Sequence, residues 1–96
     1  MFSWDARKAL LNLKKHGVSF EEAATVFADP DALDWEDLEH SGAEARSKRL
    51  GRSVQWRVLI IVYTLRRFAD GQETIGIIGA RRASYKERKA YAGQPH

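Results

Sequence analysis

Two adjacent arginines, Arg81 and Arg82, stand between an apolar segment and a short basic one. The apolar segment 75–80 is typical of a strand, and Ser84 with Glu87 has the spacing of a capping box, which marks the first turn of a helix. Arginines at such a strand-to-helix junction lie beside free helix amides and are well placed to hold a phosphate group. The sequence therefore predicts an anion site at this junction.

Basic and aromatic residues continue beyond the junction. Arg82, Lys86 and Lys89 have the spacing of one surface at the end of a helix, with Tyr85 and Tyr91 close by. Basic groups interleaved with aromatic rings suit phosphate contact combined with stacking on unpaired bases. Packing of either tyrosine on a sheet is the alternative interpretation.

Two histidines are candidates for proton transfer. His16 ends a helical pattern, where the helix dipole favours a protonated ring, so that a purely structural role would suffice; a phosphate contact or proton transfer is the alternative. His40 follows an acidic segment, whose carboxylates favour the charged form of the ring. Since histidine titrates near neutral pH, His40 could transfer a proton, or it could be an ordinary loop residue.

A glutamate and two further arginines extend the list of charged candidates. Glu44 and Arg46 alternate, which places them on one face of a strand. They form either an ion pair, or a base or orienting acid beside a phosphate clamp. Arg57 shares a strand face with Leu59 and Ile61, and we expect its guanidinium at the rim of the core.

The elements that position these residues begin with two helices. A short strand is expected at residues 2–4, followed by a helix that Asp5 caps and Gly17 ends. The spacing of Ser19 and Glu22 is a second capping box, which predicts a helix from Phe20 to about residue 27, before an Asp-Pro pair. The chain therefore starts with a helical hairpin.

Strands follow the helical hairpin. The pattern predicts strands over 33–38, 45–53, 56–65 and 73–80, then a helix over 85–91. The segment 56–65 is apolar on both faces, which indicates a central strand. We expect an α+β domain over 1–92, built as a short N-terminal strand, a helical hairpin, a four-stranded antiparallel meander and a C-terminal helix, with a frayed tail over 93–96. The helices should cover one face of the meander.

Charge is distributed unevenly along the 96 residues, whose net charge is +3. Residues 1–43 hold four basic and nine acidic groups, whereas residues 44–96 hold twelve and four. A basic half beside an acidic segment predicts a polyanion-binding face and a separate second surface. The absence of cysteine excludes disulfides and thiolate metal sites and suits a reducing cytosol. No apolar run is long enough to cross a membrane.

No metal or cofactor motif is present, so we expect no cofactor and, for any catalysis, metal-free acid–base chemistry. The pattern Phe2-x-Trp4-Asp5-x-x-Lys8, the run KHGVSFEEA over 15–23, and Val26-Phe27-x-Asp29 together resemble the opening of the BrnT toxins. Later positions also match that family in order: His40, Glu44, Arg46, Gly51, the segment 75–81, Glu87-Arg88 and Tyr91.

The resemblance implies a RelE-like ribonuclease fold and a growth-inhibiting toxin of a type II toxin–antitoxin pair. It further implies a BrnA-type ribbon-helix-helix antitoxin, a hetero-oligomer with it, and operator DNA bound mainly through the antitoxin. A metal-independent, cytoplasmic endoribonuclease is the function to be expected. A non-catalytic nucleic-acid-binding module, or a protein that only holds a partner, is the alternative.

Metal-free RNA cleavage needs a base for the 2′-hydroxyl, cations for the phosphate and an acid for the leaving oxygen. The candidates for these catalytic roles are His40, His16, Glu44, Arg46 and Arg81, and those for RNA or phosphate binding are Lys8, Arg57, Arg82, Lys86 and Tyr91. Two positions depart from the family pattern, because Gly76 replaces an arginine and Gly79 a serine. Loss of a strand arginine is expected to weaken RNA binding.

Overall fold

The computed structural model describes residues 1–40, 42 and 44–93. The elements in chain order are β1 (Phe2–Ser3), α1 (Ala6–His16), α2 (Phe20–Thr25), the 3₁₀ helix η1 (Val26–Ala28), β2 (Leu33–Glu36), β3 (Ser47–Arg52), β4 (Val58–Arg67), β5 (Glu73–Arg82) and α3 (Tyr85–Ala92). These elements confirm the α+β class. Of the predicted tail 93–96, all but Gly93 lies outside the described residues.

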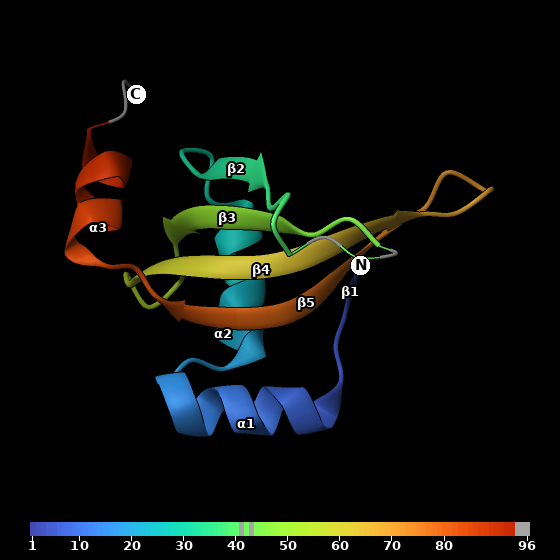
Figure 1. Cartoon of the computed structure of the whole chain (residues 1–96), viewed down its shortest axis with the longest axis horizontal. Coiled ribbons are helices and arrows are strands. Elements are labelled where there is room, and N and C mark those ends of the chain that lie inside the picture. Colours follow the sequence, from blue (N-terminus) through green and yellow to red (C-terminus); the bar gives the residue numbers. More distant parts are fainter. Residues whose placement is uncertain (41, 43, 94–96) are drawn as a thin grey trace.

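A single five-stranded sheet, in the order β1-β5-β4-β3-β2, organises the fold (Figure 1). β2, β3, β4 and β5 form the predicted antiparallel meander. β1 is parallel to β5, with Phe2 opposite Ile75 and Ser3 opposite Gly76. The first strand therefore lies against the last one, a pairing that local sequence signals do not predict.

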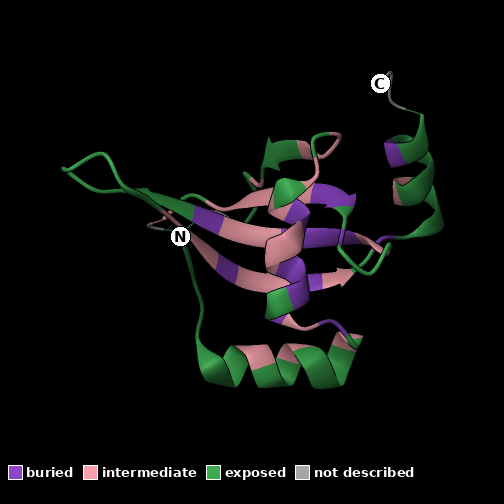
Figure 2. Ribbon diagram, turned by 180° about the vertical axis from the view of Figure 1, so that it is seen from behind, coloured by how far each residue is buried: buried purple, intermediate pink, exposed green. Residues whose placement is uncertain are grey.

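Of the helical hairpin, α2 crosses one face of the sheet and α1 lies beside β5, as Figure 2 shows from behind. Phe20 of α2 packs in a cluster with Leu59 and Ile61 of β4, and all three side chains are 0% exposed. α1 has no buried residue, and Asn12 holds it to the sheet. The Asn12 amide donates to the carbonyl of Ala80 (2.8 Å) and accepts from its N–H (3.1 Å).

The prediction that the helices share one face is wrong for α3. Tyr91 of α3 is 6% exposed and clusters with Leu50 and Ile60. Since Ile60 alternates with Leu59 and Ile61 along β4, this second cluster lies on the opposite face. β4 is apolar on both faces because α2 packs against one face and α3 packs against the other at this end of the strand.

Element boundaries differ from the sequence prediction at the β3–β4 turn. β4 begins at Val58 and not at Trp56, because Trp56 has a left-handed φ of 64° and its N–H donates to the Ser53 carbonyl (2.9 Å). The strand then runs on to Arg67, whose guanidinium pairs with Glu73 across the hairpin (2.6 Å). The hydrogen bond in the turn delays the start of β4, and the ion pair across the hairpin extends its end.

We expect Gly51→Ala to destabilise the fold by about 1–3 kcal/mol, the usual cost of overpacking. A Cβ at Gly51 would lie 2.8 Å from Val26 Cγ1 and 2.9 Å from Ala32 Cβ. Urea unfolding measures the loss. Gly79→Ala is the control, because its nearest neighbour would lie 3.9 Å away. Equal stability of the two variants would contradict the prediction.

Within the described part of the chain, no helix has both the length and the apolar character needed to cross a membrane.

Candidate functional site

The open face of the sheet carries two adjoining hollows of about 260 and 280 Å³. Thr64, Arg66 and Ile78 line both, so the hollows are continuous across β4 and β5. We call this surface the sheet groove. Its other charged lining residues are Asp5, Lys8, Glu44 and Arg46.

Segments far apart in the sequence supply the cations of the sheet groove. Lys8 comes from the first turns of α1, and Arg46 from the residue before β3. Arg66 comes from the far end of β4 and lies on the same strand face as Thr64. Three cations and two carboxylates, Asp5 and Glu44, therefore surround a floor of small and apolar side chains.

Glu44 and Arg66 face each other across the groove. The Arg66 guanidinium donates from Nε to Glu44 Oε1 (3.2 Å) and from Nη2 to Oε2 (2.8 Å). These bonds, with a further one from Thr64, lower the pKa of Glu44. The Arg66 side chain is 65% exposed and the Glu44 side chain 41% exposed, so a phosphate group can compete for the guanidinium. The lowered pKa makes Glu44 a weaker proton acceptor than a free glutamate.

His40 belongs to the same β2–β3 loop as Glu44. Its Nδ1 lies 3.0 Å from Asp37 Oδ2, and Lys48 Nζ lies 3.8 Å from the same oxygen. Desolvation opposes ionisation of Asp37, but its interactions with His40 and the charge of Lys48 lower its pKa. The Asp37 N–H also donates to the Arg46 carbonyl (2.8 Å), which closes the loop. A carboxylate on Nδ1 orients the ring and leaves Nε2 for a substrate.

His16 lies at the other end of α1, about 12 Å from Lys8 along the helix axis. It lines none of the hollows described here. The neighbouring Gly17 takes the left-handed conformation, and its carbonyl accepts from Arg57 Nη2 (3.1 Å). His40 lines none of these hollows either, but its loop also carries Glu44 and Arg46, which line the sheet groove.

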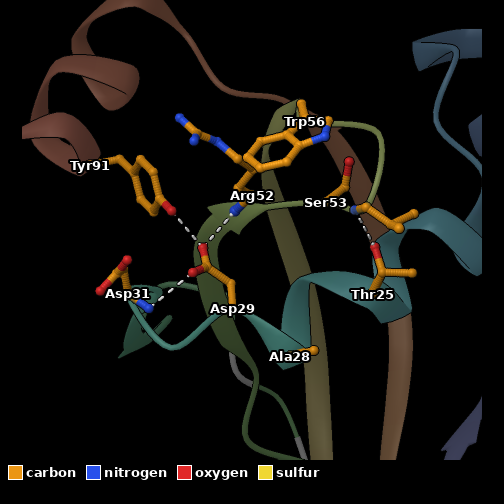
Figure 3. A pocket seen from close by; sticks show the side chains of 9 residues that line it. Thr25, Ala28, Asp29, Asp31, Arg52, Ser53, Trp56 and Tyr91 are labelled. Atoms are coloured by element: carbon orange, nitrogen blue, oxygen red, sulfur yellow. Dashed lines mark hydrogen bonds between the residues drawn. The ribbon is translucent and has the colours of Figure 1, made fainter.

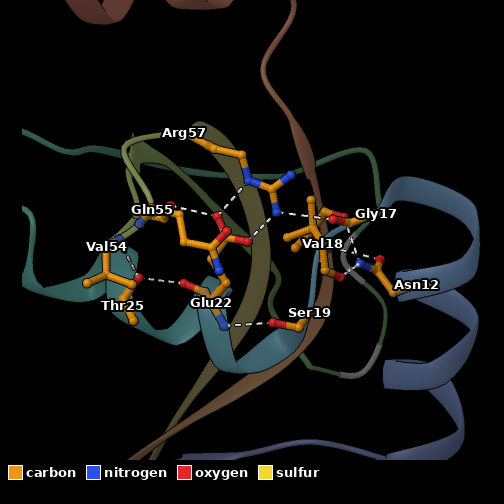
Figure 4. A network of polar contacts seen from close by, with 11 residues as sticks. Asn12, Gly17, Val18, Ser19, Glu22, Thr25, Val54, Gln55 and Arg57 are labelled. Atoms are coloured by element: carbon orange, nitrogen blue, oxygen red, sulfur yellow. Dashed lines mark hydrogen bonds and ion pairs between the residues drawn. The ribbon is translucent and has the colours of Figure 1, made fainter.

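Arg57 lies at the edge of the core, and its side chain is 23% exposed. Its guanidinium forms a bidentate pair with Glu22, which is 4% exposed and also accepts from the Ser53 hydroxyl (2.6 Å) (Figure 4). The Arg57 hydrogen bond lowers the pKa of Glu22 against the effect of burial. Arg57 is therefore committed to the fold, where it ties the start of β4 to α2.

Arg81 is paired in the same manner. Its Nη1 and Nη2 donate to the two carboxylate oxygens of Glu87 (2.8 and 2.9 Å). Glu87 Oε1 also accepts from the Ser84 N–H (2.7 Å) in the predicted capping box. The Arg81 bonds lower the pKa of Glu87 to about 2. Arg81 locks the β5–α3 junction, and its neighbour Arg82 is exposed and makes no ion pair with a described residue.

The aromatic candidates of α3 divide between core and surface. The Tyr91 ring is buried, and its hydroxyl donates to Asp29 Oδ2 (2.7 Å), so packing on the sheet is the role observed. Tyr85 is 68% exposed, with Lys89 Nζ 5.7 Å from its ring centroid. Lys86 is exposed on the same helix.

The largest hollow, about 730 Å³, lies between η1, the β3–β4 turn and α3 (Figure 3). Asp29 at its floor accepts from the Arg52 N–H (2.8 Å), from Tyr91 and from the Asp31 N–H (2.9 Å). Thr25 and Trp56 line it as well. The Asp29 carboxylate is saturated by hydrogen bonds from within the chain, so it is a structural group.

Sequence reasoning missed Arg66, Arg52, Trp56 and Arg88. Arg66 lay beyond the predicted end of β4; extending the period-two pattern from Val62 through Thr64 would have placed it on the open face. The other three have no pattern that marks them, because the turn and α3 bring them together only in the fold.

Gly76 lies in the sheet groove opposite Thr64. A Cβ at this position would come within 2.7 Å of Thr64 Oγ1. Thr64 is 7% exposed and also holds Glu44. Gly76 brings no side chain to this part of the groove. The arginine that lines it is Arg66, on the adjacent strand β4.

The described residues contain no group of three or more His, Asp or Glu side chains placed to hold a metal ion.

Comparison with known proteins identifies the fold and the family of the chain. The crystal structure of the Brucella abortus ribonuclease toxin BrnT is similar in fold, with a TM-score of 0.63 and 22% identity, and the match covers 88% of this chain and 97% of that one. Among curated proteins, none matches this chain. Residues 4–87 match the family described as "Ribonuclease toxin, BrnT, of type II toxin-antitoxin system". The chain therefore belongs to the BrnT family of ribonuclease toxins.

Proposed function

We propose that this chain is a metal-independent endoribonuclease toxin whose active site is the sheet groove. The observation that carries the proposal is the convergence of Lys8, Arg46 and Arg66 around the open hollow. Three cations from separate segments form a phosphate site, and membership of a ribonuclease toxin family makes RNA its substrate.

In this mechanism His40 Nε2 takes the proton of an RNA 2′-hydroxyl. The 2′-oxygen then forms a bond to the adjacent phosphorus as the bond from phosphorus to the 5′-oxygen breaks. The products are a 2′,3′-cyclic phosphate and a 5′-hydroxyl, whose proton comes from an acid or from water. Arg46 and Arg66 hold the phosphate oxygens while negative charge develops on them, and Glu44 positions Arg66 before RNA binds.

Membership of a type II system also supplies a partner. We propose that a BrnA-type ribbon-helix-helix antitoxin neutralises the chain in a hetero-oligomer, and that the complex binds operator DNA through the antitoxin. The site of action is the cytoplasm, where the toxin inhibits growth and translation by cleaving RNA.

The proposal is tested by expressing the chain alone in a bacterium and following growth and total mRNA together. Arg66→Ala should restore growth and mRNA integrity, because it removes a phosphate cation from the groove. Arg67→Ala is a matched control: Arg67 is 69% exposed and also pairs with a glutamate, but it points to the other face. It should remain as toxic as the parent chain.

Growth arrest without mRNA loss, or equal rescue by both arginine variants, would contradict the ribonuclease proposal. A non-catalytic nucleic-acid-binding module is the second candidate. The observation that favours it is the glycine at position 76 in the groove, where the family usually has an arginine. Normal growth with soluble parent protein and retained RNA binding would support that candidate.

A further inference from the structure

A second cationic hollow, of about 440 Å³, lies at the end of the sheet where the β3–β4 turn meets the β5–α3 junction. Four arginines line it: Arg52, Arg57, Arg82 and Arg88. We call it the arginine hollow. It is separate from the sheet groove, since Val58 at its edge and Thr64 in the groove are about 20 Å apart along β4.

The charge of the arginine hollow is largely uncompensated. Arg57 is neutralised by Glu22. The other three arginines are exposed and form no ion pair with a described residue. Arg88 Nη1 donates to the Ala83 carbonyl (3.0 Å), which holds the side chain over the junction without cancelling its charge. The hollow has no acidic lining residue, so it attracts a polyanion.

Trp56 supplies an aromatic wall. Its side chain is 78% exposed, and the Arg52 guanidinium lies 5.5 Å from its ring centroid and 5.6 Å from that of Tyr91. In Figure 3 the Arg52 side chain runs alongside the indole. An exposed ring beside guanidinium groups stacks on an unpaired base while the cations hold the flanking phosphates.

The backbone at Trp56 is strained, which is a second reason to assign the ring a function. A φ of 64° is uncommon for a bulky residue and costs about 1–3 kcal/mol. Glycine or asparagine would fit the turn better, and a tryptophan there gains almost no burial. Fixed contacts hold the turn in place, because Ser53 and Arg57 both bond to Glu22 and the Val54 N–H donates to Thr25 Oγ1 (3.0 Å). The turn therefore presents a pre-positioned ring to solvent.

We propose that the arginine hollow is a binding site for single-stranded RNA, separate from the site of cleavage, in which Arg82 and Arg88 contact phosphates and Trp56 stacks on a base. The choice of RNA as the polyanion rests on the proposed function. An acidic peptide would satisfy the arginines but would gain nothing from the indole, and bases in duplex DNA are already stacked. An unpaired strand uses both features.

The test is binding of a fluorescent, single-stranded 2′-O-methyl RNA 12-mer to the purified chain, measured by anisotropy over a range of salt concentrations. This probe cannot be cleaved, since its 2′-oxygens are blocked. Arg82→Ala with Arg88→Ala should weaken binding about tenfold or more and reduce the salt slope by about 1.4, because two phosphate contacts are lost. Lys14→Ala with Lys15→Ala removes the same charge from α1 and should change affinity less than twofold.

The ring is tested separately. Trp56→Gly should weaken binding about tenfold or more with an unchanged salt slope, since stacking carries no counterion term. Because glycine accepts the left-handed conformation, this variant should unfold at an equal or higher urea concentration. Trp56→Phe keeps a ring and should retain most of the affinity.

If the arginine pair and the lysine pair lost affinity equally, binding would depend on overall charge, and the proposed site would be wrong. Unchanged binding by Trp56→Gly, or equal competition by polyglutamate or duplex DNA, would overturn the single-strand assignment. Cleavage of unmodified RNA is scored independently. Cleavage together with probe binding that does not depend on the hollow would contradict this inference alone, whereas probe binding that depends on the hollow, without any cleavage, would contradict the proposed function alone.

Discussion

Replacing His40 with alanine should slow RNA cleavage by about 10²–10⁴-fold, the usual contribution of a positioned general base or acid. Substrate affinity should change little, because the phosphate cations Arg46 and Arg66 remain. Single-turnover cleavage of a labelled RNA, with excess protein, measures the chemical step. Asp37→Asn should cause a smaller loss and a displaced pH–rate profile, since Asp37 orients the ring through Nδ1 (3.0 Å).

His16→Ala is the matched control for this prediction. His16 ends α1, about 12 Å from Lys8 along the helix axis, whereas His40 shares its loop with the groove residues Glu44 and Arg46, so loss of His16 should leave the rate within about twofold of the parent chain. If His16→Ala abolished cleavage and His40→Ala did not, proton transfer would have to be moved away from the β2–β3 loop.

Arg57→Met should lower the free energy of unfolding by about 3–5 kcal/mol, the cost of leaving a buried partner charge uncompensated. Glu22 is 4% exposed, and Arg57 is its only ion-pair partner among the described residues. The double variant Glu22→Leu, Arg57→Met should recover much of the loss, since replacing both partners leaves no buried charge. Urea unfolding of the single and double variants measures both effects.

The pH dependence follows from the direction of the Glu22 shift. In the parent chain Arg57 lowers the pKa of Glu22, so this pair stabilises the fold above the ordinary range of a glutamate and loses its effect as the pH falls. In Arg57→Met the largest influence that lowers the pKa of Glu22 is lost while burial still raises it, so the pKa rises and protonation relieves the variant in acid. The deficit should therefore shrink between pH 7 and pH 4. A deficit independent of pH would point to lost packing.

Local signals predicted the helix ends. Asp5 caps α1 by accepting from Arg7 N and Lys8 N, Ser19 caps α2, and Gly17 ends α1 with a φ of 69°. A cap involves residues three or four apart, so its evidence lies within one short window of sequence. The hairpin joining β4 to β5 was predicted for the same reason.

Contacts between distant residues were not predictable in this way. The Glu22–Arg57 pair spans 35 positions, and the sequence did not indicate that Arg57 binds a buried carboxylate. α3 was assigned to the wrong face because the apolar pattern of β4 shows that both faces are covered without showing by what. The approach of Lys8 to Arg66 depends on β1 pairing with β5, which no short pattern encodes.

The Arg81–Arg82 junction shows how one pattern can support opposite conclusions. The capping box that predicted free arginines beside a helix start also contains Glu87, whose carboxylate engages Arg81. A single sequence does not indicate which of two adjacent arginines a nearby glutamate will pair with. Arg82 is the next residue along β5, so its side chain lies on the opposite face of the strand, where it is exposed.

The pairing of β1 with β5 has a consequence for when the sheet groove can form during synthesis. Residues 2 and 3 are made more than seventy residues before their partners at 75 and 76. Until those partners are made, Lys8 has no sheet edge beside it, and Arg66 has no β5 to complete its hairpin. A nascent chain therefore carries only separate parts of the groove, which come together after β5 has been made.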